Sequence, residues 1–138
     1  MATANNFVFD TNVIVSAVLL PRSVPRQAFN IAIRTGKLIA SPESIAELEE
    51  VLRRPHLEKY VAEAERLEFL VDYLGAADLI IPSVKITDCR DAKDNKFLEL
   101  AMDGKAAQIV TGDADLLVLH PFRGISVVTP QAFLAQPW

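Results

Sequence analysis

The chain has 138 residues, of which 51% are hydrophobic and only 7% aromatic. This length predicts a single domain, residues 1–138, with a core built mainly from Val, Ile, Leu and Ala. The net charge of -4 shows no general basic footprint for nucleic acid. No apolar run approaches the roughly 18 residues of a membrane helix, and the N-terminus lacks the features of a secretory signal. With one cysteine, Cys89, no internal disulfide can form, so we expect a cytoplasmic location and no membrane.

Short apolar runs alternate along the chain with amphipathic segments that end at proline or glycine. This alternation predicts, in chain order, strand 7–9, helix 13–20, helix 25–36, strand 38–40, helix 42–54, helix 58–74, strand 79–81, helix 92–103, strand 108–110, strand 126–128 and helix 130–134. Strands that alternate with helices throughout indicate a parallel sheet covered on both faces, which is an α/β fold of three layers.

Individual residues set some of the expected boundaries. The helix that begins at Pro25 should carry Phe29 and Ile33 on one face and stop at Gly36, because glycine commonly follows a helix end. Asp91 is a plausible N-cap for the helix that follows it. These residues predict helix ends and burial, but not chemistry.

Five acidic residues occupy positions that stability alone explains poorly. They are Asp10, Glu47, Asp94, Asp113 and Asp115. Asp10 and Asp113 follow predicted strands, and the carboxyl ends of parallel strands are where such sheets bind ligands. Carboxylates gathered there raise one another's pKa unless a cation lies between them. The sequence therefore predicts a divalent-metal site. Without these five acids the charges nearly balance, so the net charge does not exclude a nucleic-acid partner.

Each acid also has a structural explanation. Asp10 can cap the helix that follows it, and Glu47 can lie on a solvated helix face beside other glutamates. Asp94 can complement a helix dipole one turn after the expected cap. The two turn acids are of a residue type that is common in turns. Any one acid is weak support for a metal site, whereas their joint placement at one edge of the sheet is stronger support.

Four motifs occur in an order and spacing that match a known family. They are Asp10-Thr11-Asn12, then Ser41-Pro42 leading to Glu47-Leu48, then Arg90-Asp91-Ala92-Lys93-Asp94-Asn95-Lys96-Phe97-Leu98, then Thr111-Gly112-Asp113-Ala114-Asp115-Leu116-Leu117. With these motifs the chain resembles the PIN-domain nucleases, in particular the VapC-like toxins of bacterial and archaeal toxin–antitoxin pairs. The resemblance extends from Phe7 to Pro130.

The resemblance implies a fold and a set of site residues. The implied fold is a three-layer α/β/α arrangement around a five-stranded parallel sheet of order 3-2-1-4-5, in which strands one and four meet where the connections reverse direction. The implied catalytic residues are Asp10, Glu47, Asp94 and Asp113. The implied ligands of Mg²⁺ or Mn²⁺ are Asp10, Asp94 and Asp113, and the supporting residues are Asn12, Thr111 and Asp115.

The residue types favour metal-assisted hydrolysis. Mg²⁺ and Mn²⁺ prefer oxygen ligands and need neither cysteine nor histidine. The two histidines, His56 and His120, lie beside prolines at a helix break and in a loop. Activation of water would therefore fall to the metal, in hydrolysis of phosphodiester bonds in RNA rather than DNA, with Glu47 as a residue that could orient the water. One and two metal ions are both open.

Substrate contacts and partners are less constrained by the sequence. Basic residues near the acidic edge are candidates for phosphate contacts, with solvated surface charge as the alternative: Arg22, Arg26, Arg53, Arg54, Lys93 and Lys96. The long helix over residues 58–74 suits packing against a second copy, which predicts a homodimer. The resemblance further implies a cognate antitoxin protein that covers the acidic cleft.

Other hypotheses use the same acids. A PIN-domain nuclease of RNA processing or repair, outside a toxin–antitoxin pair, would have the same site. A haloacid-dehalogenase-like phosphatase needs a second aspartate two residues after Asp10, where this chain has Asn12. A receiver domain is phosphorylated after strand three, where this chain continues into Pro82-Ser83. A non-catalytic PIN-like binding module predicts loss of the acidic quartet, which is complete here.

Overall fold

A parallel sheet forms the centre of the molecule in the computed structural model, which describes residues 5–138. Its strands are β1 (Asn5–Phe9), β2 (Gly36–Ala40), β3 (Asp78–Leu79), β4 (Gln108–Val110) and β5 (Ser126–Val128). The helices are α1 (Thr11–Leu19), α2 (Val24–Thr35), α3 (Pro42–Leu52), α4 (Glu63–Ala76), α5 (Asn95–Asp103), α6 (Ala114–Leu117) and α7 (Pro130–Leu134), with 3₁₀ helices η1 (Pro55–Lys59) and η2 (Ala92–Asp94). All neighbouring strands are parallel and their order is β3-β2-β1-β4-β5, which confirms the predicted fold class.

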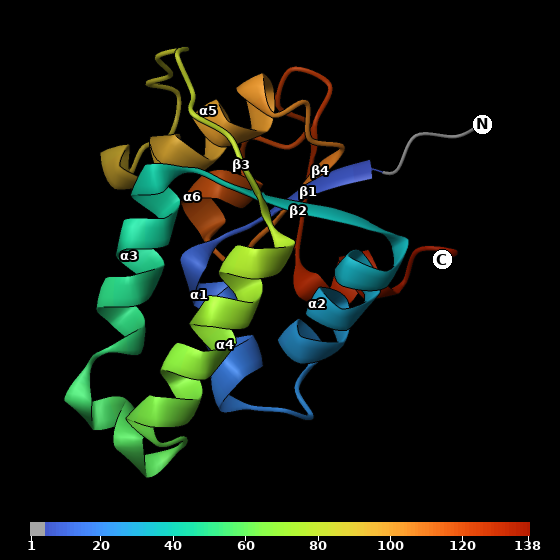
Figure 1. Ribbon diagram of the computed structural model, residues 1–138. Coiled ribbons are helices and arrows are strands. Elements are labelled where there is room, and N and C mark those ends of the chain that lie inside the picture. The colour runs from blue at the N-terminus through green and yellow to red at the C-terminus, as the bar shows by residue number, and fades with distance from the viewer. Residues whose placement is uncertain (1–4) are drawn as a thin grey trace.

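Helices cover both faces of the sheet (Figure 1). Helices α1 to α4 and α7 pack on one face, and α5 and α6 pack on the other. Successive residues of β1 divide between the two layers, because strand side chains alternate in direction: Phe7 and Phe9 enter the first core and Val8 enters the second. With both faces buried, the strand ends are the parts of the sheet that remain for binding a ligand.

The end of α2 falls at Gly36 as predicted, but for a different reason. The backbone of Gly36 is extended, with φ −160°, and glycine is needed because a Cβ would lie 2.3 Å from the carbonyl oxygen of Asn5. Of the two residues predicted on one face, Phe29 is buried, whereas Ile33 is 46% exposed. Ala28 and Ala32 join Phe29 on the buried face instead, which rotates Ile33 toward solvent.

The predicted helix over residues 58–74 is divided into two elements, and this prediction was wrong in its first turn. After Pro55 the chain forms η1, and α4 begins only at Glu63. The buried side chain of Arg66 joins the two parts, since it donates to the carbonyl oxygen of Val61 (3.2 Å) and pairs with Glu58 (3.6 Å). The contacts of Arg66 hold the segment between η1 and α4 in place without an α-helix.

Smaller differences concern short elements. Strand β3 stops at Leu79 rather than residue 81, and Ile81 is exposed just before Pro82, which cannot donate to a strand ladder. The predicted helix over residues 92–103 begins with the 3₁₀ turn η2. Helix α6 lies in a segment that was predicted only as a turn. Across residues 5–138, no helix combines the length and apolarity that crossing a membrane requires.

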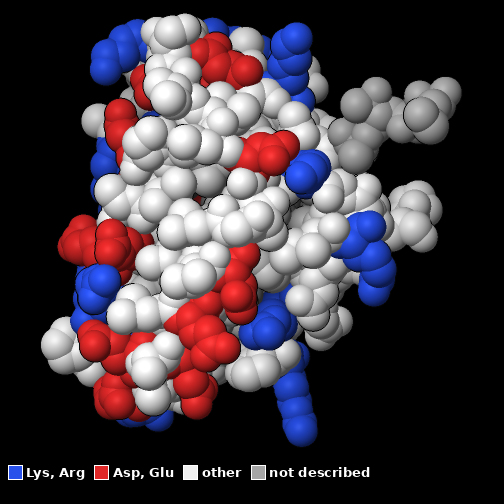
Figure 2. Space-filling model, in the orientation of Figure 1, with Lys and Arg blue, Asp and Glu red and all other residues white. Residues whose placement is uncertain are grey.

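Acidic side chains gather over one end of the helical layer that contains α4 (Figure 2). The first turn of α4 itself carries Glu63 and Glu65. The face drawn in Figure 2 has no continuous basic surface among the described residues, and scattered acidic and basic side chains lie among uncharged ones over the rest of it.

Candidate metal-binding and active site

A cleft opens where the carboxyl ends of β1 and β4 lie side by side. The register pairs Phe9 with Val110, so Asp10 and Thr111 leave the sheet next to each other. The chain leaves β1 toward β2 and leaves β4 toward β5, in opposite directions, which makes this the switch point of the sheet. The cleft has a volume of about 420 Å³ and is lined by Asp10, Thr11, Asn12, Glu47, Glu50, Val51, Arg54, Lys93, Asp94, Phe97 and Asp113.

Asp10 both caps a helix and lines the cleft. Its Oδ1 accepts a hydrogen bond from the backbone N–H of Val13 (2.9 Å), so it is the N-cap of α1. Its Oδ2 accepts a hydrogen bond from the hydroxyl of Thr111. Burial raises the pKa of Asp10, and these two hydrogen bonds oppose that rise. The structural and functional hypotheses for Asp10 are therefore compatible.

Thr111 connects the two strand ends through its hydroxyl group. The side chain is buried, and besides donating to Asp10 its hydroxyl accepts from the N–H of Asp113 (3.0 Å). Asp113 caps α6 by accepting from the N–H of Asp115 (2.8 Å). Asp115 does not line the cleft in the described part of the chain; its backbone carbonyl accepts from the thiol of Cys89 (3.6 Å). Asp115 therefore contacts its neighbours through its backbone N–H and carbonyl groups, and its carboxylate is not among the described groups that line the cleft.

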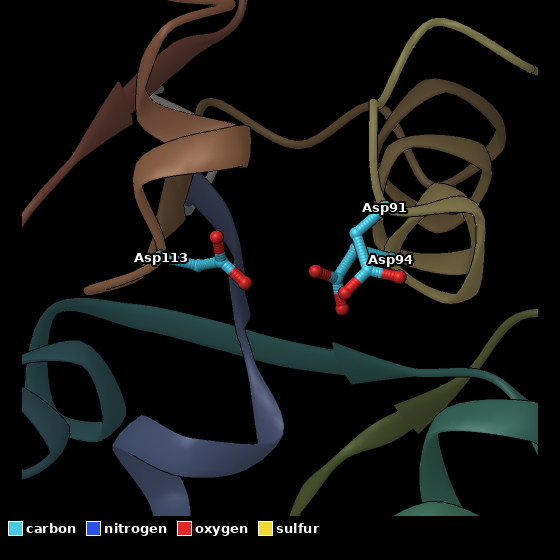
Figure 3. A group of neighbouring side chains, drawn as sticks. All are labelled: Asp91, Asp94 and Asp113. Atoms are coloured by element: carbon cyan, nitrogen blue, oxygen red, sulfur yellow. The ribbon is translucent and has the colours of Figure 1, made fainter.

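Three aspartates bring carboxylate oxygens together across the cleft. Asp91, Asp94 and Asp113 each offer an oxygen within 4.8 Å of the others. Figure 3 shows Asp113, on the turn after β4, facing Asp91 and Asp94 from the start of the helical segment that contains η2 and α5. Two of the three predicted metal ligands, Asp94 and Asp113, belong to this group. Asp10 lines the same cleft outside the group, and its role as a ligand stays a prediction.

Asp94 has an oxygen for which the protein supplies no partner. The residue is 7% exposed, and its Oδ2 is buried without a hydrogen bond from the described residues. It occupies the N-cap position of α5, yet its side chain makes no capping hydrogen bond. A buried carboxylate oxygen without a partner is costly. Complementing the helix dipole, the structural explanation offered for Asp94, leaves this buried oxygen without a hydrogen bond from the described part of the chain.

The electrostatics of Asp94 fit a bound cation. Burial, a hydrogen bond and charge repulsion with Asp113, and the charge of Asp91 together raise the pKa of Asp94 to about 7. A divalent cation between these groups would lower that pKa by stabilising the carboxylates. The donor set contains only oxygen, which suits Mg²⁺ or Mn²⁺. The residues present therefore fit such an ion.

Glu47 reaches the cleft from α3, in a different electrostatic setting. Its Oε1 accepts from the hydroxyl of Thr11, and its Oε2 is 3.0 Å from Nζ of Lys96. Partial burial raises the pKa of Glu47, but the hydrogen bonds from Thr11 and Lys96 and the charge of Lys96 outweigh this effect, so the pKa lies below its usual range. The charge on Glu47 is thus stable without a metal.

Asp91 is the site residue that sequence reasoning missed. It was predicted as a helix cap, and it does accept from the N–H of Lys93 at 3.4 Å, at the start of η2. The available signal was its spacing of three residues from Asp94, which places both side chains on one side of a helical turn. A residue that caps a helix can therefore also bring a carboxylate oxygen close to those of Asp94 and Asp113.

The basic residues proposed for phosphate contact are divided by the structure. Arg54 and Lys93 line the cleft. Arg53 pairs with Glu49 along α3, and Arg26 donates to the carbonyl oxygen of Ala17. Arg54 and Lys93 can therefore meet a substrate in the cleft, whereas Arg53 and Arg26 are engaged elsewhere.

Residues 6–115 match the PIN domain family. The chain belongs to this family. This PIN domain is 34% identical over 140 residues to the uncharacterized protein MJ1680 of Methanocaldococcus jannaschii, an alignment that covers 94% of this chain and 89% of that protein. PIN domains are typically metal-dependent nucleases, and an acidic cluster is present in the cleft of this one.

Two solved structures share the fold. A chain from the crystal structure of VapBC2 of Rickettsia felis, bound to a DNA fragment from their promoter, has a TM-score of 0.58 and 16% identity, covering 88% of this chain and 96% of that one. PAE2754 of Pyrobaculum aerophilum has a TM-score of 0.57 and 14% identity, covering 95% and 88%. Together with the family match, these likenesses support the α/β PIN architecture.

Proposed function

We propose that this chain, acting as a single PIN domain over residues 1–138, is a Mg²⁺- or Mn²⁺-dependent endoribonuclease. The observation that carries the proposal is the buried, unpartnered Oδ2 of Asp94, which lies beside Asp91 and Asp113 in a cleft at the switch point of the sheet. A carboxylate group arranged in this way is unfavourable alone and favourable around a cation.

The acids divide between holding the ion and arranging the reaction. Asp94 and Asp113, with Asp91 and Asp10 beside them, would hold the metal. When bound, the ion would supply charge neutralisation at the phosphate and a lower pKa for water. Thr111 fixes the orientation of Asp10 through its hydroxyl group. Glu47, which is charged and held at the cleft wall by Thr11 and Lys96, would accept a hydrogen bond from an attacking water.

Arg54 and Lys93 are the proposed phosphate contacts. Arg54 pairs with Glu50 at 3.4 Å and Lys93 with Asp91 at 3.9 Å, and the basic partner in each pair is at least half exposed. Exposed pairs of this kind contribute only about 0–1 kcal/mol, so exchanging the carboxylate for a phosphate costs little. Each residue can therefore turn toward a nucleic-acid strand in the cleft.

The biological setting we propose is that of a toxin with a cognate antitoxin, as a homodimer. The four motifs in VapC-like order support this setting, and so does the fold shared with a chain of the VapBC2 complex. Expression of the chain alone should arrest growth of the host cell, and co-expression of a small protein encoded beside its gene should relieve the arrest. Growth arrest that persists in the Asp94→Asn variant would contradict a nuclease toxin.

The nuclease proposal is tested by RNA cleavage with the purified chain. We expect cleavage with Mg²⁺ or Mn²⁺, none with EDTA, and a loss of at least about 10²-fold in Asp94→Asn, since that oxygen is central to holding the ion. The matched control is Asp72→Asn, which removes one exposed aspartate on α4 and should cleave like the wild type. Activity that survives chelation, or equal activity in Asp94→Asn, would overturn the mechanism.

A further inference from the structure

Lys96 and Glu47 form a shielded ion pair in the wall of the cleft. Lys96 lies in the first turn of α5, two residues after Asp94, and its side chain is only 10% exposed. Its Nζ lies 3.0 Å from Oε2 of Glu47, whose side chain is 25% exposed, and also donates to the carbonyl oxygen of Lys93. This lysine therefore faces a carboxylate of the site rather than solvent.

The pair differs from the other ion pairs of the described chain. In each of those, at least one partner is more than a third exposed, as in Arg53–Glu49 on α3. Exposed pairs contribute little, but removing one partner of a shielded pair leaves a charge without compensation. Lys96 is thus a determinant of where the Glu47 carboxylate lies.

Glu47 and Asp94, which both line the cleft, differ in how their oxygens are hydrogen-bonded. Both oxygens of Glu47 have partners, Thr11 at Oε1 and Lys96 at Oε2. Asp94, in contrast, has a buried Oδ2 without one. An ion entering the cleft would meet an available oxygen on Asp94 but would have to displace an ammonium group to reach Oε2 of Glu47.

We propose that Lys96 is a positioning residue that keeps Glu47 off the metal ion, so that the aspartates alone coordinate it and Glu47 remains available to orient water. This inference rests on the proposed nuclease function. It also reassigns Lys96 from a candidate phosphate contact to an internal partner of Glu47. The arrangement explains why an acidic site contains a largely shielded lysine.

The proposal is tested by Mn²⁺ binding, measured by electron paramagnetic resonance, in four proteins. Lys96→Met leaves Glu47 unpaired and should tighten Mn²⁺ binding by about five- to tenfold, because it adds one net negative charge beside the ion. Glu47→Gln should weaken binding by a similar factor, since Lys96 then repels the ion. The double variant removes both charges together and should bind Mn²⁺ like the wild type.

Catalysis supplies the second readout. Lys96→Met should lower kcat by at least about tenfold with little change in KM, since Glu47 loses its orientation, and Lys96→Arg should recover most of kcat. Lys37→Met is the matched control, because it removes the exposed partner of Asp78 at the opposite end of the sheet and should alter neither readout.

Two results would overturn the inference. If the double variant loses Mn²⁺ as completely as Asp94→Asn does, Glu47 is itself a ligand. If Lys96→Met binds Mn²⁺ like the wild type, Lys96 does not act on the site. Absence of Mn²⁺ binding in the wild type would instead remove the metal site, and with it both the nuclease proposal and this inference.

Discussion

Backbone N–H groups at the starts of helices hold most of the site aspartates in place. Asp10, Asp91 and Asp113 each accept a hydrogen bond from a backbone N–H at the start of a helix. Capping engages one oxygen of each carboxylate and fixes the direction of its side chain. Asp94 is the exception, because it occupies a cap position without a capping hydrogen bond.

A first prediction concerns Asp94 and the stability of the metal-free protein. Because the folded state raises the pKa of Asp94 to about 7, it binds the proton more tightly than the unfolded chain does. The stabilisation is present below pH about 4 and is lost as pH rises through about 7, by at most about 4 kcal/mol. The Asp94→Asn variant has no carboxyl group to deprotonate at this position, so it avoids this loss of stability. At pH 7.5 without metal it should therefore melt at a higher temperature than the wild type. A lower melting temperature would contradict the prediction.

A second prediction concerns the pH dependence of metal binding. Protons and the ion compete for Asp94, so the apparent affinity for Mn²⁺ should fall about tenfold for each pH unit below about 7 and level off above it. The raised pKa of Asp10 acts in the same direction. Titrations between pH 5.5 and 8 measure this slope, and a flat profile would exclude Asp94 from the ion's ligands.

At the scale of elements, the strands and the flanking helices follow from local patterns. Strands β4 and β5 and helix α7 have the predicted bounds, because β-branched runs and the Thr129-Pro130 start signal leave few alternatives. The sequence could not show that η1 precedes α4, since the amphipathic pattern runs through both. That boundary depends on the buried Arg66, whose partners are known only once the chain is folded.

A third prediction compares two glycines. Gly36→Ala would place its Cβ 2.3 Å from the carbonyl oxygen of Asn5 and 2.7 Å from the ring of Phe7, so β2 would have to move away from β1. We expect a loss of about 2–3 kcal/mol in the free energy of unfolding. Gly75→Ala is the control, because nothing lies within 4 Å and the residue is in α4, where alanine should add about 0.5–1 kcal/mol. Urea denaturation measures both, and equal effects would refute the close approach of β2 and β1.

At the scale of the whole molecule, the last strand and helix complete the core although they lie beyond the residues that match the family. The ring of Phe133 on α7 is fully buried and packs edge-on against Phe7 (5.2 Å between ring centres) and Phe9 (5.7 Å). These rings connect the C-terminal helix to β1, the strand that leads into Asp10. The site therefore depends on a distant part of the chain for its support.

A fourth prediction follows for Phe133. Phe133→Ala should cost about 3–5 kcal/mol, because a fully buried aromatic side chain is replaced by a cavity beneath β1. Gln131→Ala, at an exposed position of the same helix, should change stability by less than about 0.5 kcal/mol. Thermal unfolding followed by circular dichroism provides the comparison. A small effect of Phe133→Ala would mean that α7 is not part of the cooperative core.

The sequence by itself determined the α/β class, the strand order through the family motifs, and the acids Asp10, Glu47, Asp94 and Asp113 as cleft residues, because strand periodicity and motif spacing are local properties of the chain. The tertiary structure alone decided that Asp91 joins the cluster and that Lys96 pairs with Glu47. It also decided that Asp94 has an oxygen without a hydrogen-bond partner among residues 5–138. These three facts depend on distances between segments that come together only when the sheet forms, and such distances are not encoded in any local pattern.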